Sequence, residues 1–207
     1  MHDDATLKSV LPSLGPGQNL AGYLWRATNL EKLFGFHATT PYLPQPLYSP
    51  GGPMQRGQRF TPPGGPRSLY MGEDMLTAYA ESNRIAAAFL TQAHQLLPPK
   101  PPTVLFLAEF ELKNVLDATL PAVQNVLGTS DAELKQPWRR LKRRRQPVPT
   151  WRLGQAVFNS GLFDGMRYPS ANRQDGVCIV VFVGRLKKPA SFVRVYDPDK
   201  NLKQRLP

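Results

Sequence analysis

The sequence contains very little cysteine and histidine, and these two shortages exclude several kinds of site. The single cysteine, Cys178, cannot form a disulfide within the chain or a cysteine-rich metal site. The histidines His2, His37 and His94 share no metal-ligand spacing, so we expect no metal ion. Cys178 lies in the run VCIVVFV, which favours a buried core position for its side chain.

Long hydrophobic runs are also absent. No segment reaches the roughly 18 apolar residues that a membrane-spanning helix needs. The first ten residues, MHDDATLKSV, lack the basic and apolar regions of a signal peptide. There is no internal repeat, and neither G-x-G-x-x-G nor G-K-[ST], the glycine-rich phosphate-binding motifs, occurs. These absences predict a cytoplasmic protein in a reducing compartment, without membrane contact.

Acidic residues are few compared with basic ones. The chain has 15 Asp and Glu against 26 Lys and Arg, a net charge of +11, which predicts a negatively charged partner or substrate. The segment Arg139–Arg145, RRLKRRR, concentrates six of these cations. Three interpretations stay open for it: a solvated loop, contact with an acidic partner and, ranked last, nucleic-acid binding, because no aromatic residues alternate with the cations.

Length and composition indicate one globular domain. The chain has 207 residues, of which 41% are hydrophobic and 20% charged. Its 22 prolines predict extended loops. We expect a loosely held lead-in over residues 1–21 and a single domain over 22–207, with a Pro/Gly-rich loop at 29–58 and a basic loop at 138–149.

Apolar and β-branched runs predict a series of short strands. They cover residues 22–28, 68–71, 103–112, 115–117, 166–168, 177–183 and 192–196. Their mixed order and the small number of helical patterns favour an α+β domain with a largely antiparallel or split sheet.

Three segments have helical patterns. One begins at Glu73 or Asp74 and continues to Pro98, with Met75 and Tyr79 opening an apolar stripe. A second has the capping-box spacing S-D-A-E over residues 130–133. The third is expected to begin at a Thr150 cap, run through Asn159 and end at a C′ glycine, Gly161.

One stretch, residues 57–81, combines a cation, an aromatic ring and a carboxylate. Its sequence, GQRFTPPGGPRSLYMGEDMLTAYAE, places Arg59 in a loop, Tyr70 in a strand and Glu81 in a helix. Such a corner suits a small anionic ligand with a ring and a sugar. Without further context, the competing interpretation of Glu81 is an exposed glutamate that pairs with Arg84 on the helix surface. Arg26, which closes the first strand, faces either solvent or a ligand.

The order of several motifs resembles the RES domain, a family named after an arginine, a glutamate and a serine. The motifs are GQRF, PPGG, LYMG and TAYAES, followed much later by GLFDGMRYPSAN and by Gly176 before VCIVVF. The resemblance covers roughly residues 22–184. It implies a fold similar to the mono-ADP-ribosyltransferases, with split, mostly antiparallel sheets flanked by a few helices.

The resemblance also implies a function. RES proteins look like toxins of bacterial toxin–antitoxin pairs whose substrate is NAD, so we expect a cognate antitoxin and no tightly bound cofactor. NAD degradation by hydrolysis or phosphorolysis ranks ahead of ADP-ribose transfer to a protein. A non-catalytic module that binds nucleic acid or an acidic partner through residues 139–145 is the alternative from another class. Whether the chain forms a homodimer is left open.

By the same resemblance, four residues would form the NAD site, with Arg26 as a second cation. Arg59 would bind the pyrophosphate, for which Arg26 and Arg67 are further candidates, because an arginine fork matches phosphate oxygens. Tyr70 would offer its ring to nicotinamide and also carries a hydroxyl. Glu81 would stabilise the sugar cation that forms during cleavage.

Ser170 is the fourth expected site residue. Its hydroxyl would bind ribose or the carboxamide of nicotinamide. A role as covalent nucleophile is disfavoured, because no histidine base lies in the G-x-S-x-G setting of a serine hydrolase. Without the resemblance, an ordinary turn serine is the competing interpretation.

Overall fold

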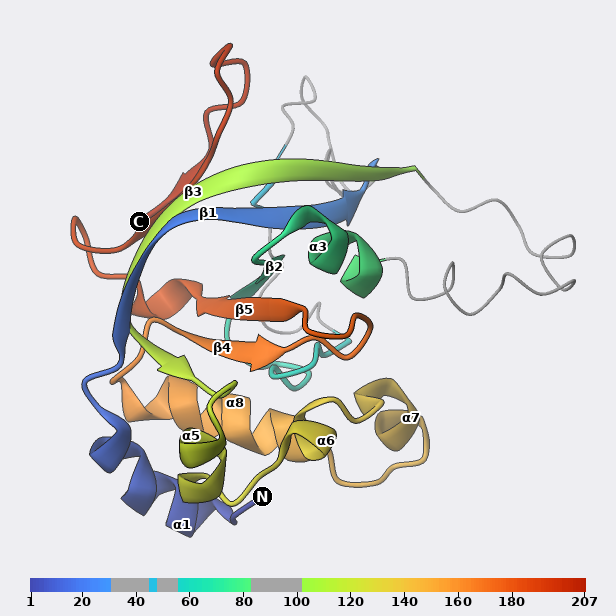
Figure 1. Ribbon diagram of the computed structural model, residues 1–207, viewed down its shortest axis with the longest axis vertical. Coiled ribbons are helices and arrows are strands. Elements are labelled where there is room, and N and C mark those ends of the chain that lie inside the picture. Colours follow the sequence, from blue (N-terminus) through green and yellow to red (C-terminus); the bar gives the residue numbers. More distant parts are fainter. Residues whose placement is uncertain (31–44, 48–55, 83–101) are drawn as a thin grey trace, which may run out of the picture.

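The computed structural model describes residues 1–30, 45–47, 56–82 and 102–207 (Figure 1). The strands are β1 (Gln18–Asn29), β2 (Ser68–Gly72), β3 (Thr103–Asp117), β4 (Gly165–Pro169), β5 (Val177–Phe182), β6 (Phe192–Val195) and β7 (Arg205–Leu206). The α-helices are α1 (Asp4–Val10), α3 (Met75–Ser82), α5 (Pro121–Val126), α6 (Asp131–Leu134), α7 (Trp138–Arg143) and α8 (Pro149–Ser160). Two 3₁₀ turns, η1 (Leu11–Leu14) and η4 (Val183–Arg185), complete the described elements.

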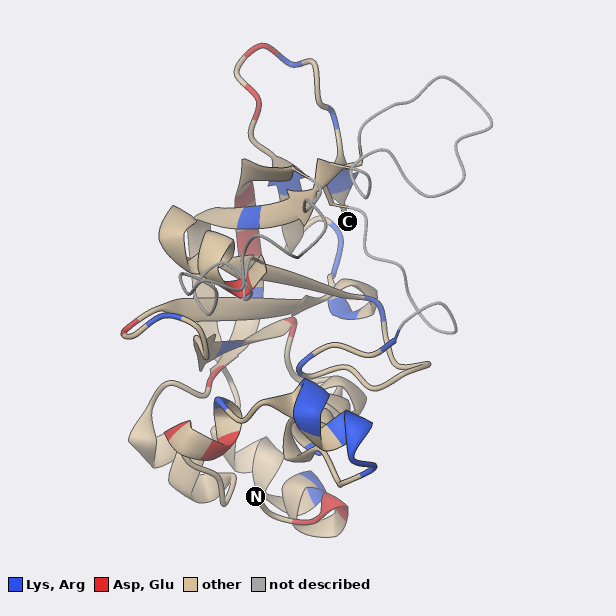
Figure 2. Cartoon of the chain, turned by 90° about the vertical axis from the view of Figure 1, so that its right-hand side faces the viewer, with Lys and Arg blue, Asp and Glu red and all other residues tan. Residues whose placement is uncertain are grey.

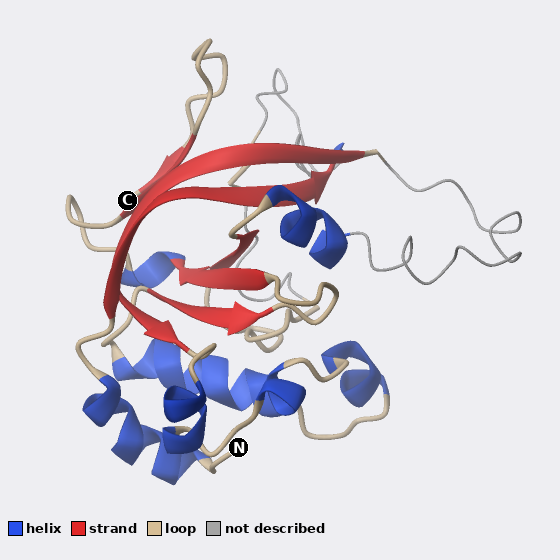
Figure 3. Cartoon of the chain, viewed as in Figure 1, coloured by secondary structure: helices blue, strands red, loops and turns tan. Residues whose placement is uncertain are grey.

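The strands form one mixed sheet that folds back on itself. Their order is β1-β2-β5-β4-β3-β6-β7, and β1 also pairs with β3. The long antiparallel ladder of β1 and β3 runs from Gln18 opposite Val115 to Asn29 opposite Thr103. Beyond this ladder β3 pairs in parallel with β4, so the sheet divides into an upper curved part and a lower part of β2, β5 and β4 (Figure 3). This confirms the α+β class, and each predicted strand overlaps an observed one, but 103–112 and 115–117 are parts of the single strand β3, and β7 was not predicted.

Helices α1, α5, α6 and α8 gather below β4, on the side away from the curved β1–β3 ladder (Figures 1 and 3). Helix α8 buries Leu153 and Val157 against Phe163 and Met166, all of them almost inaccessible to solvent. These residues belong to one of two apolar core clusters that the described residues form. The other cluster includes Leu24 of β1 and Val181 of β5. None of the described helices is both long and apolar enough to cross a bilayer.

The expectation of a loosely held lead-in is wrong for residues 1–20. Asp3 caps α1 by accepting a hydrogen bond from the amide of Thr6 at 2.8 Å. Leu7 and Leu11 are fully buried in the core beneath α8. Two leucines four residues apart lie on one face of a helix, which is enough to attach this otherwise polar segment.

The helix-terminus predictions were partly right. The amide of Glu133 donates to Ser130 Oγ at 3.3 Å, so Ser130 caps α6 as predicted, but the Glu133 carboxylate accepts from Thr129 Oγ1 at 2.8 Å instead of completing a reciprocal capping box. Gly161 ends α8 with φ of 70°, a left-handed conformation that favours glycine. Thr150 is not the cap, because α8 begins at Pro149 with Val148 before it. Proline suits the first helical turn, where its missing N–H costs nothing.

The basic segment is not a loop throughout. Its first part forms α7, whose leading residue Trp138 is only 4% exposed and fixes the helix to the domain. The cations of α7 therefore stand on a helix with a defined position, and Arg139, Arg140 and Arg143 are exposed on it.

The apolar stripe predicted for α3 is wrong at its start. Met75 and Tyr79 are 43% and 45% exposed, whereas Thr77 and Ala78 are buried. Glu81 lies on the buried side, since it follows Thr77 by one helical turn. The predicted helix beyond residue 82 and most of the loop at 29–58 lie outside the described residues.

Candidate active site

A pocket of about 310 Å³ lies between β1, β2, α3 and the start of α7. Its volume is at the lower end of the range of about 300–1,000 Å³ for small-molecule sites. The charged residues among its described lining are Arg26, Arg59, Arg139 and Glu81, and the aromatic ones are Trp25, Tyr70, Trp138 and Tyr168. The pocket therefore combines three guanidinium groups with one carboxylate.

Arg59 is buried, with 4% of its surface exposed, and one end of its guanidinium is fixed. Nη1 donates to the carbonyl oxygens of Leu134, at 2.9 Å, and Gln136, at 3.1 Å. Nη2 is inaccessible to solvent and has no hydrogen-bond acceptor among the described residues. Because a buried donor without an acceptor is costly, an anionic ligand group at this nitrogen would be strongly favoured.

Tyr70 lines the pocket with its ring and supports the Arg59 loop with its hydroxyl. The hydroxyl accepts from the amide of Phe60 at 3.0 Å and lies 2.9 Å from Thr61 Oγ1. Thr61 gives its own proton to Ser68, so Tyr70 is the donor to Thr61. Burial raises the pKa of Tyr70, which keeps the phenol neutral. The Tyr70 hydroxyl thus has no proton left to donate to a ligand, and the residue lines the pocket.

Helix α8 holds the same loop from below. Trp151 Nε1 donates to the carbonyl of Gln58 at 2.6 Å. Gly154 lies so close to the loop that a Cβ there would be 1.8 Å from the carbonyl oxygen of Phe60. A glycine is therefore required at this point of α8, and the backbone beside Arg59 is held on two sides.

Glu81 is oriented by the segment that follows β4. Its Oε1 accepts hydrogen bonds from Ser170 Oγ at 2.7 Å and from the amide of Ala171 at 3.0 Å. Because α3 turns this side chain toward the pocket, the carboxylate is both fixed and accessible from the ligand side. The alternative pairing with Arg84 lies outside the described residues.

Ser170 does not lie on the described pocket lining. It is 1% exposed, donates its only proton to Glu81, and accepts from the amides of Asn172 and Arg173, each at 3.2 Å. A hydroxyl with this set of partners has no proton left for ribose or a carboxamide. In this geometry the Ser170 proton goes to Glu81, and the expected contact with ribose or the carboxamide stays a prediction.

Arg26 lines the pocket from β1. Its Nη1 is buried, and desolvation lowers the pKa of the guanidinium to about 10, so the group still carries its charge at neutral pH. Arg67, the third candidate for pyrophosphate binding, is exposed and is not part of the pocket lining.

Arg139 lines the pocket as well, although the sequence had indicated it only as one cation of the basic run. It stands at the pocket rim, with its guanidinium 4.6 Å from the ring centroid of Trp138. Burial and then the charge of Arg59 lower its pKa, while Glu81 acts in the opposite direction. The feature of the sequence that could have indicated a packed position for Arg139 is Trp138, the apolar residue directly before the basic run.

The fold and the pocket together define an α+β domain with a cation-rich pocket. The model of the RES domain matches residues 23–203, and the chain belongs to this family. Among solved structures it is similar to the toxin MbcT in the "M.tuberculosis MbcT-MbcA toxin-antitoxin complex", with a TM-score of 0.56, 18% identity, and coverage of 95% of this chain and 94% of that chain. At 18% sequence identity, this structural similarity shows that the two chains share a fold. No curated protein matches the chain.

Proposed function

We propose that this chain is an NAD-consuming enzyme that cleaves the nicotinamide–ribose bond, and that it is the toxin of a bacterial toxin–antitoxin pair. Membership of the RES family supports the proposal, as does the fold shared with a toxin. The observation that carries it is one pocket holding three guanidinium groups and a single carboxylate oriented by two hydrogen bonds.

The guanidinium groups suit the pyrophosphate of NAD. Nη2 of Arg59 is a buried donor directed to no described acceptor, and Arg26 and Arg139 add positive charge around it. Arginine binds phosphate oxygens through paired, charge-assisted hydrogen bonds. The ring of Tyr70 and the neighbouring Trp25 offer flat surfaces for the nicotinamide and adenine rings.

The carboxylate of Glu81 suits the chemistry at the sugar. When the bond between ribose C1′ and the nicotinamide nitrogen breaks, the electron pair leaves with nicotinamide. The pyridinium departs as a neutral molecule, so no general acid is required. Positive charge develops on C1′ as in glycoside hydrolysis, and a fixed carboxylate stabilises it or holds a ribose hydroxyl. This accounts for one carboxylate where most glycosidases use two.

The acceptor of the ADP-ribosyl group distinguishes the alternatives within this proposal. Attack by water gives ADP-ribose and a proton, attack by phosphate gives ADP-ribose phosphate, and attack by a side chain gives a modified protein. Incubation of the purified protein with NAD, with and without phosphate and with cell extract, followed by mass analysis of small molecules and proteins, identifies the acceptor. Absence of nicotinamide release in all three incubations would refute the proposal.

Ser170→Ala is expected to lower kcat about tenfold and to change KM for NAD little. The substitution removes one of the two printed hydrogen bonds to Glu81 Oε1 and leaves two backbone amides without their acceptor. The second effect costs on the order of 1–3 kcal/mol of stability. Steady-state kinetics and a melting curve measure both. A large rise in KM with unchanged kcat would instead indicate direct contact with the substrate.

Arg139→Gln is expected to raise KM for NAD about tenfold, since a hydrogen bond to a charged group contributes roughly 1.5–3 kcal/mol. Arg140→Gln is the matched control, because Arg140 is on the same helix but does not line the pocket. Equal KM values for the two variants, measured at low salt, would exclude Arg139 from substrate binding.

A cognate antitoxin would restrain such an enzyme in its own host. The start of α7 lines the pocket, and basic residues are concentrated on this helix, which is largely blue in Figure 2. Arg143, Arg144 and Arg145 are exposed there, and an acidic segment of the antitoxin that crosses α7 would also block the pocket. Inhibition by the antitoxin should then weaken as salt is raised. Salt-independent inhibition would argue against this docking site.

A further inference from the structure

Helix α3 is attached to the chain that follows β4 at both of its ends. At its C-terminal end Glu81 is held by Ser170 and Ala171. Just before its N-terminal end lie two consecutive acids, Glu73 and Asp74, and each is bound by an arginine from residues 165–176. These arginines, Arg167 and Arg173, have no part in the substrate contacts proposed above.

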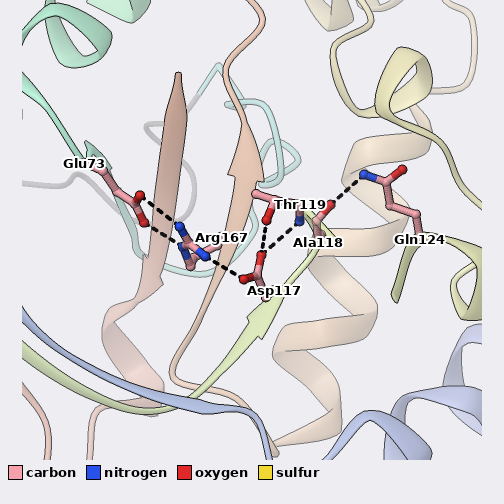
Figure 4. A network of polar contacts seen from close by, with 6 residues as sticks. All are labelled: Glu73, Asp117, Ala118, Thr119, Gln124 and Arg167. Carbon is pink, nitrogen blue, oxygen red and sulfur yellow. Dashed lines mark hydrogen bonds and ion pairs between the residues drawn. The ribbon is translucent and has the colours of Figure 1, made fainter. Parts of the chain in front are cut away.

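Arg167 binds Glu73 through two parallel hydrogen bonds. Nε donates to Oε1 at 2.6 Å and Nη2 donates to Oε2 at 2.9 Å, as the paired dashed lines show (Figure 4). Hydrogen bonding to Glu73 raises the pKa of Arg167 against the effect of burial. The amide of Glu73 also donates to the carbonyl of Val177 at 3.0 Å, so this residue is fixed at its backbone and its side chain.

The other side of Arg167 is anchored at the end of β3. Nη1 donates to Asp117 Oδ2 at 2.6 Å, and the buried Asp117 accepts from the amide of Thr119 at 3.0 Å through its other oxygen. Gln124 of α5 binds the neighbouring carbonyl of Ala118 at 2.9 Å (Figure 4). A continuous polar chain thus joins the beginning of α3 to the helical layer.

Arg173 closes a second contact. Its Nη1 donates to Asp74 Oδ1 and, at 3.0 Å, to Thr77 Oγ1, while its amide donates to Ser170 Oγ. Asp74 caps the helix, accepting from the amide of Thr77 at 2.9 Å. Burial acts to raise the pKa of this carboxyl, but bonds from Thr77 and Arg173 lower it overall.

The fit around Thr77 leaves little freedom. A Cβ on Gly176 would come within 2.7 Å of Thr77 Oγ1 and 3.1 Å of Ser170 Cβ. Thr77 and Glu81 are one turn apart on the same helix face, so a shift of α3 at Thr77 is transmitted to the carboxylate.

We propose that Arg173, assisted by Arg167, is a positioning residue that fixes α3 against the Ser170–Ala171 backbone and thereby sets the orientation of Glu81. This inference rests on the proposed function, because it assigns Glu81 its role in cleavage. The pair of Arg173 with Asp74 is well exposed, at 36% and 46%, so it contributes little to overall stability. The rate of NAD cleavage is more sensitive than the stability of the fold, since a displacement of a catalytic group by about 1 Å can lower the reaction rate about 100-fold.

Arg173→Ala is therefore expected to lower kcat for NAD cleavage 10- to 100-fold, with KM within about threefold of the wild type. Arg194→Ala is the matched control, because it breaks another exposed arginine–carboxylate pair, with Glu109, away from the pocket.

Further variants test the same contact. Arg173→Lys should recover part of kcat. Asp74→Asn should lower kcat as well, and the double variant should be no slower than the slower single variant, because both changes remove one contact. Arg167→Ala is a poor test, since it leaves the buried Asp117 without its arginine.

Amide hydrogen exchange over residues 75–82 tests the attachment without any reaction. Arg173→Ala should accelerate exchange there about two- to fivefold, the range that an exposed ion pair of up to about 1 kcal/mol gives, and Arg194→Ala should not. Unchanged exchange in Arg173→Ala would overturn the positioning role, as would unchanged kcat in a protein whose wild type cleaves NAD. A wild type that cleaves no NAD, combined with accelerated exchange in Arg173→Ala, would refute the proposed function and leave the attachment of α3 in place.

Discussion

Glu81→Gln is expected to reduce the rate of nicotinamide release from NAD about 1,000-fold while the protein stays folded. The substitution removes the negative charge that faces the developing sugar cation, and fixed electrostatic groups of this kind contribute on the order of 100- to 1,000-fold. Glutamine keeps an oxygen that accepts from Ser170 and Ala171, so the local hydrogen bonds survive. Single-turnover kinetics with saturating NAD measure the effect on the chemical step.

The matched control for this variant is Glu111→Gln. Glu111 forms an exposed ion pair with Lys113 on β3 and is not part of the pocket lining. Its rate should equal that of the wild type. If Glu81→Gln retained more than about a tenth of the wild-type rate, the carboxylate would not be the group that stabilises the sugar cation.

Arg59→Ala is the second substitution with a large expected effect, and it should act on binding and on folding together. Loss of the buried Nη2 donor should raise KM for NAD about 10- to 100-fold, because a charge-assisted hydrogen bond to phosphate contributes roughly this factor to binding. Loss of Nη1 leaves the carbonyls of Leu134 and Gln136 without this donor, which costs on the order of 1–3 kcal/mol of stability. Steady-state kinetics and denaturant unfolding separate the two effects.

Arg67→Ala is the natural comparison, because Arg67 lies in the same stretch of sequence but is exposed outside the pocket. Its KM should match that of the wild type. Arg59→Lys adds a further distinction, since lysine keeps the charge but cannot form a planar fork. A KM near the wild-type value in Arg59→Lys would contradict paired hydrogen bonding by Arg59.

Most of the strands could be predicted because their apolar runs are local, whereas the two-residue strand β7 has no such run. Dense apolar runs such as residues 103–112 and 177–183 were assigned correctly, and β3 and β5 occupy them. The attachment of α1 could not be predicted in the same way. Its polar composition concealed Leu7 and Leu11, whose burial depends on contact with α8, about 140 residues further along the chain.

The order of the motifs along the chain indicates the candidate site, whereas the hydrophobic pattern around each of its residues does not. Arg26, Arg59, Tyr70 and Glu81 all line one pocket, although Glu81 alone reads as an ordinary helical glutamate. Their roles toward NAD stay predictions. For Ser170 the motif identified the residue, but its task depends on its neighbours: the amides of Asn172 and Arg173 saturate the hydroxyl and direct its proton to Glu81.

Arg139 and Arg173 show what the sequence concealed. Arg139 was one of six cations in a run for which a solvated loop, an acidic partner and nucleic-acid binding all stayed open, and its place in the pocket lining follows from the helix that begins at the buried Trp138. Arg173 is bonded to Asp74, 99 residues earlier in the sequence, and no local pattern indicates a contact of that separation. Both assignments needed the three-dimensional arrangement.

Nicotinamide release by the purified wild-type protein is the most direct test of the central claim. Incubation with NAD should yield one nicotinamide for each NAD consumed, and the Glu81→Gln variant, prepared in parallel, should yield almost none. Intact NAD after prolonged incubation with folded wild-type protein, with phosphate and cell extract supplied as acceptors, would contradict the account.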